Sequence, residues 1–216
     1  MFGSSIEPNK KRSKKSKDKL IIVGDSNVGK STLIKIFTGE RVRKHITTPV
    51  NESNILSLTF HTNHGDKNID IWDTAGQEYS DDDTRETYIE NADIALVIYD
   101  VNDNNSRYNV PKWIEKIKSI CGDDIPITII GNKMDTVSED KKPIVMRNAR
   151  FNQYKNITSI LFSVLEKQNY NKSNRGRRHQ LLDIFDNLFE CFYSSNIKIL
   201  DFTTPTENQF KTMRVV

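Results

Sequence analysis

The stretch Gly24-Asp25-Ser26-Asn27-Val28-Gly29-Lys30-Ser31 decides the fold class of this 216-residue chain. It fits the pattern G-x-x-x-x-G-K-[ST], follows the apolar run 20–23, and precedes residues 31–37, whose apolar positions repeat at helical spacing. Between a strand and a helix, the two glycines let successive backbone N–H groups point inward, and the helix N-terminus adds its dipole. The stretch therefore predicts a loop that binds phosphate.

Side chains of this loop are expected to bind as well as its backbone. The Lys30 ammonium would supply positive charge to the β- and γ-phosphates, and the Ser31 hydroxyl is a hard oxygen ligand suited to Mg²⁺. The predicted ligand contacts of the loop are Asp25, Ser26, Asn27, Val28, Gly29, Lys30, Ser31 and Thr32.

Short apolar runs alternate with amphipathic segments from residue 19 onward, which is typical of parallel strands with crossover helices. Residues 61–66 have turn chemistry, so the strands before and after them form a hairpin. The sequence predicts an α/β fold, a three-layer sandwich around a six-stranded, mostly parallel sheet with one antiparallel hairpin strand. The expected strands are 20–23, 54–60, 68–72, 94–99, 126–130 and 157–163, and the expected helical stripes lie in 31–37, 110–121 and 181–192.

Composition and charge divide the chain into three parts. Hydrophobic residues make up 36% and charged residues 28%, and no apolar run approaches the roughly 18 residues of a membrane helix. Two cysteines cannot form a disulfide framework. The whole chain has a net charge of +3. Residues 1–19 alone carry +5, so the remaining residues sum to −2. We expect a disordered basic tail over 1–18, a folded domain over 19–195 and an extension over 196–216 that ends loosely from residue 203.

A second motif, Asp73-Thr74-Ala75-Gly76-Gln77-Glu78, stands at the end of the hairpin's second strand. Asp73 can hold Mg²⁺ directly or through water, and Gly76 lets its N–H approach a γ-phosphate. Gln77 is placed to orient an attacking water. The motif therefore predicts phosphoryl-transfer chemistry beside the phosphate-binding loop.

A third motif, Asn132-Lys133-Met134-Asp135, follows the buried run 126–130. Asp135 is an acceptor-only carboxylate that matches the two parallel donors of guanine, whereas adenine would face it with a lone pair. The Lys133 stem can lie along a base, and Asn132 can tie this loop to the phosphate-binding loop. The ligand predicted from the three motifs is a guanine nucleotide at the carboxyl ends of parallel strands.

Together these motifs resemble the Ras-like small GTPase superfamily over residues 19–195, with the P-loop NTPase fold of the Ras-like G domain. Within it, three stretches are similar to the Ran family: Phe60-His61-Thr62-Asn63-His64-Gly65, Asn109-Val110-Pro111-Lys112-Trp113 and Asn169-Tyr170-Asn171. The resemblance implies GTP/GDP and Mg²⁺ as cofactors. It also implies catalytic roles for Gln77, Lys30 and a threonine of switch I, for which Thr48 matches better than Thr47. The implied metal ligands are Ser31, Thr48 and Asp73, and the implied third base-contacting motif is Ser163, Val164 and Leu165.

The sequence departs from the Ran pattern on the surfaces that face partners. Ser80-Asp81-Asp82-Asp83 stand where Ran has a Phe-Gly-Gly-Leu stretch, and the three neighbouring carboxylates are expected to repel one another and loosen this loop. The basic patch before the last strand is thinned to Asn152-Gln153-Tyr154-Lys155. In the third base motif Ser163 is present, but the lysine is lost or displaced to Lys167. Ran's acidic C-terminal tail is replaced by a mildly basic end.

The resemblance implies a molecular switch in nucleocytoplasmic transport with slow intrinsic hydrolysis. The alternatives are a nucleotide-bound interaction module with little hydrolysis and a Rab-like trafficking regulator, which is disfavoured because the last cysteine is Cys191. Expected partners are an exchange factor, an activating protein and an importin-β-type receptor. A monomer without a lipid anchor is expected in the nucleus and cytoplasm. The basic residues 10–15 fit a nuclear localisation signal, a patch for nucleic acid or acidic lipid, or a solvated tail.

Overall fold

A computed structural model of the chain describes residues 16–37, 52–73, 82–149, 151, 157–161, 185–186, 189, 193, 199–203 and 211–214. Eight strands of this part form one sheet with the order β6-β5-β4-β1-β3-β2-β7, and β8 also pairs with β2. Their bounds are β1 Asp18–Val23, β2 Glu52–Thr62, β3 Gly65–Asp73, β4 Ile94–Asp100, β5 Ile127–Asn132, β6 Ile157–Leu161, β7 Ile199–Thr203 and β8 Lys211–Arg214.

The six predicted strands are present as β1 to β6, with the predicted topology. Strand β1 pairs in parallel with β3 and β4, β4 with β5, and β5 with β6. Strand β2 runs antiparallel to β3 over the full hairpin, from Asn54 opposite Asp73 to Thr62 opposite Gly65. The α/β fold and the mostly parallel sheet are confirmed.

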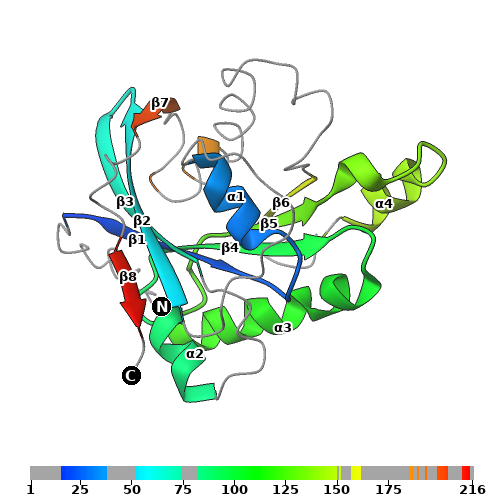
Figure 1. Cartoon of the computed structure of the whole chain (residues 1–216), viewed down its shortest axis with the longest axis horizontal. Helices are drawn as coiled ribbons and strands as arrows, with labels where there is room; N and C mark the ends of the chain where they lie inside the picture. The colour runs from blue at the N-terminus through cyan, green and yellow to red at the C-terminus, as the bar shows by residue number, and fades with distance from the viewer. Residues whose placement is uncertain are drawn as a thin grey trace, which may run out of the picture.

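Helices cover both faces of the sheet, as Figure 1 shows with α1 on one side and α2 and α3 on the other. The described helices are α1 Lys30–Phe37, α2 Asp82–Ile89, α3 Asn104–Cys121 and α4 Lys142–Asn148, with a 3₁₀ turn, η1, at Met134–Thr136. Helix α3 begins after Asp103, whose side chain accepts from the Asn105 N–H, and ends at Gly122 with a φ of 94°.

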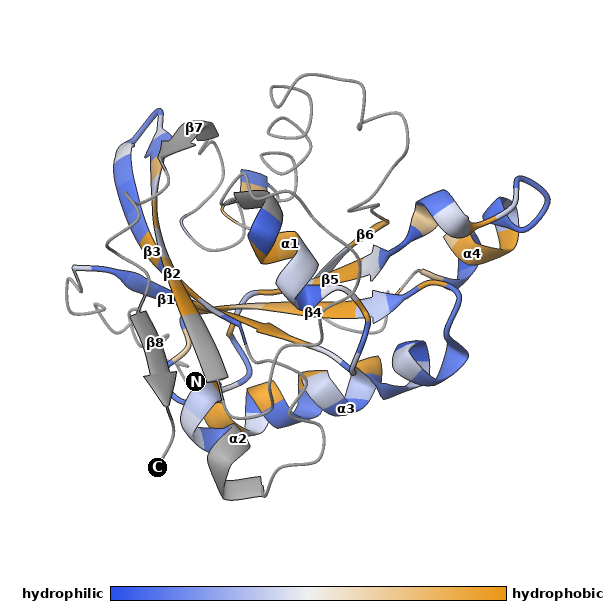
Figure 2. Cartoon of the chain, in the orientation of Figure 1, coloured by the Kyte–Doolittle hydropathy of each residue, from blue (hydrophilic) through white to orange (hydrophobic). Residues whose placement is uncertain are grey.

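Two apolar clusters fill the space between the sheet and these helices, because every central strand sends alternate side chains to opposite faces. Leu20 and Ile22 of β1 belong to one cluster, and Ile21 and Val23 belong to the other. The middle of each central strand is therefore apolar, as the orange stretches of β1, β4 and β5 in Figure 2 show. Phe185 and Phe189, part of the predicted 181–192 stripe, pack with Phe60 in the α1-side cluster at centroid distances of 4.8 and 5.1 Å.

The hairpin turn is shorter than the predicted turn at 61–66. The strands continue to Thr62 and resume at Gly65, where φ is +91°. The Thr62 hydroxyl donates to the Gly65 carbonyl at 2.6 Å and accepts from the His64 N–H at 3.1 Å. This side chain satisfies the polar groups of the turn, which lets the pairing extend further.

The loose tail expected from residue 203 is wrong for β8, and β7 lies in the extension just before that tail. Strand β7 pairs antiparallel with β2 from Thr203 opposite Thr59 to Ile199 opposite Thr62, and β8 pairs with Glu52–Ile55 through Lys211–Arg214. In a six-stranded sheet β2 would be an edge strand with unpaired N–H and C=O groups, and the two added strands pair with both ends of that edge. At the other terminus, the ordered sheet begins at Asp18, and the Lys17 ammonium contacts Asp70 at 3.0 Å.

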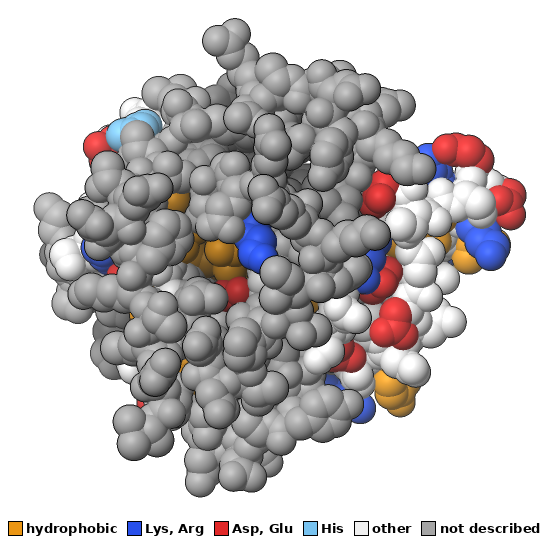
Figure 3. Space-filling view, viewed as in Figure 1, with side chains coloured by type: hydrophobic (Ala, Val, Ile, Leu, Met, Phe, Trp, Pro, Cys, Tyr) orange, Lys and Arg blue, Asp and Glu red, His pale blue; other side chains and the backbone are white. Residues whose placement is uncertain are grey.

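Helices α2 and α4 were not predicted. The acidic run was expected to loosen its loop, but Asp82 and Asp83 are the first two residues of α2. Helix α4 buries no side chain, which is why no apolar stripe marks it, and both acidic and basic side chains lie on the surface around it (Figure 3). Among the described helices, none is long and apolar enough to cross a membrane.

Candidate guanine-nucleotide site

The described parts of the three motifs meet at one edge of the sheet. The loop 24–29 follows β1, Asp73 ends β3, and Asn132 ends β5. These strands run parallel to one another through β4, so their carboxyl ends share one edge. That edge is where open α/β sheets bind ligands.

The phosphate-binding loop is closely packed at both of its glycines. A Cβ on Gly24, where φ is +141°, would lie 2.0 Å from the Ile98 carbonyl oxygen. A Cβ on Gly29, where φ is +106°, would lie 2.3 Å from Nδ2 of Asn132. Asn27 also has a positive φ, of 66°, so the loop turns through left-handed conformations at three positions. Only glycine fits at residues 24 and 29.

The Lys30 ammonium lies inside the curl of this loop. Its side chain is 5% exposed, and Nζ donates to the carbonyl oxygens of Gly24 at 2.5 Å and Asp25 at 2.6 Å. A buried ammonium requires acceptors, and these two carbonyls hold it in one place. The loop therefore carries a fixed positive charge at the start of α1, as binding of a phosphate anion requires.

Asp73 and Ser31 form a pair that fits a divalent cation. Asp73 is 1% exposed, and its side chain hydrogen-bonds to the Ser31 side chain. Burial raises the pKa of the Asp73 carboxyl, against the lowering effects of the Ser31 hydrogen bond and of the charges on Lys30 and Lys35. Its Oδ1 atom has no hydrogen-bond partner, although a buried carboxylate oxygen normally has one. Mg²⁺ beside Oδ1 would satisfy this atom and favour the ionised carboxylate.

A Mg²⁺ ion at this pair would also need oxygen ligands from elsewhere. Within the described ranges, no group of three or more His, Cys, Asp or Glu side chains could hold a metal. Mg²⁺ commonly takes few protein ligands and completes its shell with water and phosphate oxygens. The donor set of Ser31 and Asp73 therefore fits a metal that binds together with a nucleotide.

Asn132 joins the phosphate end of the site to the base end. It is 2% exposed, its Nδ2 donates to the Val28 carbonyl at 2.8 Å, and its Oδ1 accepts from the Lys133 N–H at 2.8 Å. The predicted tie between the two loops is present. One buried amide thus holds the phosphate-binding loop and the Asn132–Asp135 segment in a common position.

The base-binding segment is held by residues that its motif does not include. Lys133 has a φ of +69°, and its Nζ lies 2.8 Å from Oδ2 of Asp100 at the end of β4. Asn102 donates to the Thr136 hydroxyl at 2.6 Å, and that hydroxyl donates to the Lys133 carbonyl at 2.7 Å. Asp135 lies within η1 with its side chain exposed, so the carboxylate is accessible to a base.

Helix α3 contacts the phosphate-binding loop through two further residues that we had not assigned to the site. Asn109 Nδ2 donates to Oδ2 of Asp25 at 2.7 Å, and Trp113 Nε1 donates to Oδ1 of Asp25 at 2.9 Å. Both belong to the stretch that resembles Ran, and no local pattern marks either residue as a partner of the loop.

Part of the predicted site lies outside the described residues. The structure places Asp25 to Thr32, Asp73, Asn132, Lys133 and Asp135 together at one sheet edge. The remaining site residues stay predictions: Thr48, Gly76, Gln77, Ser163, Val164 and Leu165.

Comparison with known families agrees with this geometry. The family model described as "Ras family" matches residues 19–178, well over half of the chain. The matched range contains the phosphate-binding loop, Asp73 and the segment from Asn132 to Asp135. Members of this family are GTPase switches that bind guanine nucleotides, generally with Mg²⁺, and act with regulatory proteins. This chain belongs to the Ras family of small GTPases.

Proposed function

We propose that this protein is a Ran-like GTP/GDP switch that acts in nucleocytoplasmic transport and hydrolyses GTP slowly unless a partner assists. The main support for nucleotide binding is the buried Asp73 carboxylate, which has one oxygen without a hydrogen-bond partner. It lies beside Ser31 and the buried Lys30. This arrangement supports a site for a phosphate chain with its metal, and Asn132 links it to the segment that fits guanine.

Ser31 and Asp73 would hold Mg²⁺, with Thr48 as a further ligand in the triphosphate form. The ion would neutralise charge on the phosphates, and Lys30 would add a second fixed charge. Gln77 would orient the attacking water. No arginine of the phosphate-binding loop or switch I is assigned as a finger in cis, so unassisted turnover should be on the order of 10⁻⁴ s⁻¹.

The transport role is supported by the stretches that resemble Ran. The turn residues of Phe60-His61-Thr62-Asn63-His64-Gly65 make specific contacts: Thr62 closes the turn, and His61 Nδ1 lies 2.9 Å from Oδ1 of Asp66. In the second stretch, Asn109 and Trp113 bind the phosphate-binding loop. The expected partners are an exchange factor, an activating protein and an importin-β-type receptor, and the expected compartments are nucleus and cytoplasm.

A pull-down against an importin-β-type receptor tests this role. The protein is loaded with GDP or with a non-hydrolysable GTP analogue, and the bound nucleotide is verified by chromatography. Binding in the triphosphate form alone is the expected result. No binding by either verified form would leave a GTP switch with another partner.

A nucleotide-bound interaction module is the second candidate, favoured by the acidic residues at the start of α2, a surface that Ran-type proteins use for partners. Single-turnover GTP hydrolysis separates the two candidates. The proposed switch hydrolyses GTP, and Gln77→Leu slows it. Equal rates for both proteins would refute the role of Gln77, and no hydrolysis would favour the module.

The basic tail provides a separate test of localisation. Deleting residues 1–15 removes five of its basic side chains but keeps Lys17 and its contact with Asp70. If the tail carries a nuclear localisation signal, a tagged deletion variant should lose nuclear accumulation. Unchanged distribution would identify the tail as dispensable for localisation.

A further inference from the structure

We propose that Asn109 and Trp113 are positioning residues that keep the phosphate-binding loop competent to bind nucleotide by holding the carboxylate of Asp25. This inference rests on the proposed binding of guanine nucleotide at that loop. Neither side chain needs to touch the ligand, because both would act through Asp25.

The two donors engage both oxygens of one carboxylate. Asn109 Nδ2 lies 2.7 Å from Oδ2, and Trp113 Nε1 lies 2.9 Å from Oδ1. The residues are four apart on α3, so their side chains lie on neighbouring turns of the same helix side. Hydrogen bonds to an ionised acceptor are about twice as strong as those between neutral groups.

The orientation of the Asn109 amide is set by a second contact. Its Oδ1 accepts from the Lys112 ammonium at 3.0 Å, and Lys112 Nζ also lies 5.4 Å from the ring centroid of Tyr108. Because the amide oxygen accepts a hydrogen bond from the Lys112 ammonium, the amide nitrogen is the atom that faces Asp25. The direction of donation from helix to loop is therefore determined by the network.

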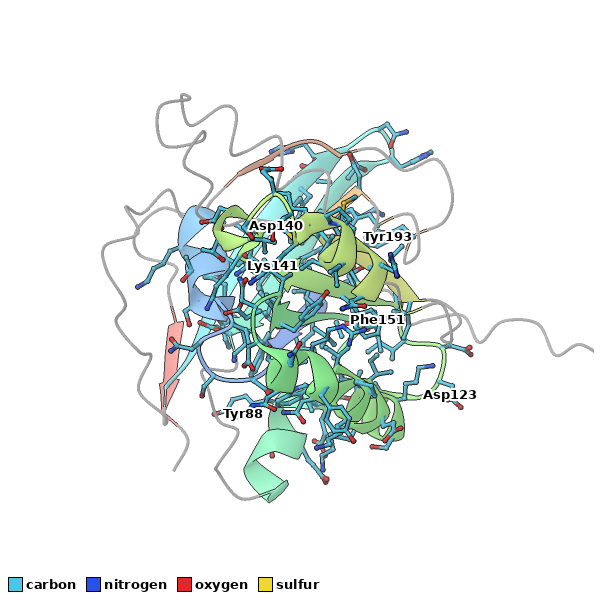
Figure 4. The ribbon with its side chains drawn as sticks, turned by 90° about the vertical axis from the view of Figure 1, so that its right-hand side faces the viewer. Tyr88, Asp123, Asp140, Lys141, Phe151 and Tyr193 are labelled. Atoms are coloured by element: carbon cyan, nitrogen blue, oxygen red, sulfur yellow. The ribbon has the colours of Figure 1, made fainter. Side chains whose placement is uncertain are left out.

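Helix α3 provides a firm support for these donors. Its side chains Val110, Ile114 and Ile117 are fully buried in the cluster between α3 and the sheet. At its start, Arg107 donates to the Asn148 carbonyl at 3.0 and 2.6 Å and stacks over Phe151 at 5.8 Å, which ties α3 to the end of α4. Phe151, labelled in Figure 4, also packs edge-on against Tyr99 of β4.

The loop needs such support because Asp25 is an anionic residue in an anion-binding loop. A carboxylate free to turn toward the ligand would repel the phosphates and compete for the Lys30 ammonium. The Lys30 ammonium also binds the main-chain carbonyl of Asp25 at 2.6 Å, so a shift of Asp25 would displace an acceptor of that charge. Holding the Asp25 side chain on α3 therefore preserves the conformation of the phosphate-binding loop and the position of the Lys30 ammonium.

The test measures dissociation of a fluorescent GDP analogue from the full-length protein in Mg²⁺ after addition of excess GDP. Trp113→Phe keeps an aromatic ring but removes the donor, and Asn109→Asp keeps the size but places two carboxylates together. We expect dissociation to be about tenfold faster in each, which is the effect of losing about one charge-assisted hydrogen bond. Matched controls are Trp72→Phe, which changes the chain's other tryptophan, and Asn105→Ala on the same helix; both should dissociate at the wild-type rate.

A double-mutant cycle separates positioning from simple packing. In an Asp25→Ala background, Trp113→Phe should change the dissociation rate by less than about twofold, because the acceptor is already gone. Wild-type rates in both single variants, or a full acceleration that persists without Asp25, would overturn the inference. If the wild-type protein itself does not bind the GDP analogue, the proposed function fails, and this inference fails with it.

Discussion

The phosphate end and the base end of the site are held in place by different means. The loop at residues 24–31 is secured by side chains far away in sequence: Asn109 and Trp113 of α3, 84 and 88 residues from Asp25, and Asn132, 104 residues from Val28. The base end is secured by partners close to it in the chain or at the end of the neighbouring strand β4: Asp100, Asn102 and its own Thr136.

This difference predicts how the two ends respond to substitution. The phosphate end depends on tertiary packing, so a change there should affect both folding and nucleotide binding. The base end is a compact surface turn with partly exposed partners, so a change there should affect mainly binding. Four substitutions test the contrast.

Gly24→Ala should have the largest effect. The added Cβ would lie 2.0 Å from a backbone carbonyl in β4, which cannot move without breaking the sheet. We expect the free energy of unfolding to fall by more than about 4 kcal/mol, measured by denaturant titration. The control is Gly65→Ala, which has a φ of +91° but nothing within 4 Å of the new Cβ; it should lose about 1–2 kcal/mol. Equal losses would show that strain at a positive φ, rather than close packing, limits residue 24.

Asn132→Ala should have the next largest effect because it disconnects the two ends. It removes the bond to the Val28 carbonyl and leaves this acceptor in a buried position. We expect the free energy of unfolding to fall by about 2 kcal/mol and the affinity for GDP to fall as well. Asn102→Ala removes two exposed hydrogen bonds at the base end alone, to Asp100 and Thr136, and should lose less than about 1 kcal/mol. A larger loss for Asn102→Ala would reverse the proposed contrast.

Asp73→Asn tests the metal at the phosphate end. The substitution replaces the anionic carboxylate, which Mg²⁺ prefers as a ligand, with a neutral amide of nearly the same size. We expect removal of Mg²⁺ with EDTA to speed GDP release from the wild-type protein by about tenfold or more, and to change the variant much less. The check is the same dissociation assay with and without EDTA. Equal EDTA effects in both proteins would place the ion elsewhere.

Asp100→Asn should have the smallest effect. It weakens the ion pair with Lys133, whose side chain is 29% exposed, so solvent screens part of the interaction. We expect GDP to bind about fivefold more weakly, with little change in unfolding, as measured by calorimetric titration and denaturant titration. A loss of stability comparable to that of Asn132→Ala would mean that the base end also supports the fold.

Much of the fold could be predicted because its strands carry strong local signals. The runs 20–23 and 94–99 are continuously apolar, and 126–130 is apolar except for Thr128, because helices cover both faces of β1, β4 and β5. In β2 the apolar residues alternate with others, and Leu56, Leu58 and Phe60 are the buried ones. Helix α4 and strands β7 and β8 could not be predicted in this way, because α4 buries nothing and the two strands are defined by the partner edge of β2.

The site shows the same limit. Its motifs identified the groups expected to face the ligand, because ligand chemistry dictates those residue types at those positions. The groups that hold the motifs in place were not visible, because an asparagine or tryptophan on a helix has many structural uses. The contacts of Asp25 with Asn109 and Trp113 exist only once the sheet has brought β1 and α3 together.

The most direct measurement of the central claim is a calorimetric titration of the nucleotide-free protein with GDP and with ADP in Mg²⁺. The two ligands share their phosphates and differ in the base, so the pair tests both ends of the site at once. We predict that GDP binds at least about a thousandfold more tightly than ADP, because adenine leaves the Asp135 carboxylate without donors. Similar affinity for both nucleotides, or no binding of GDP, would contradict the account.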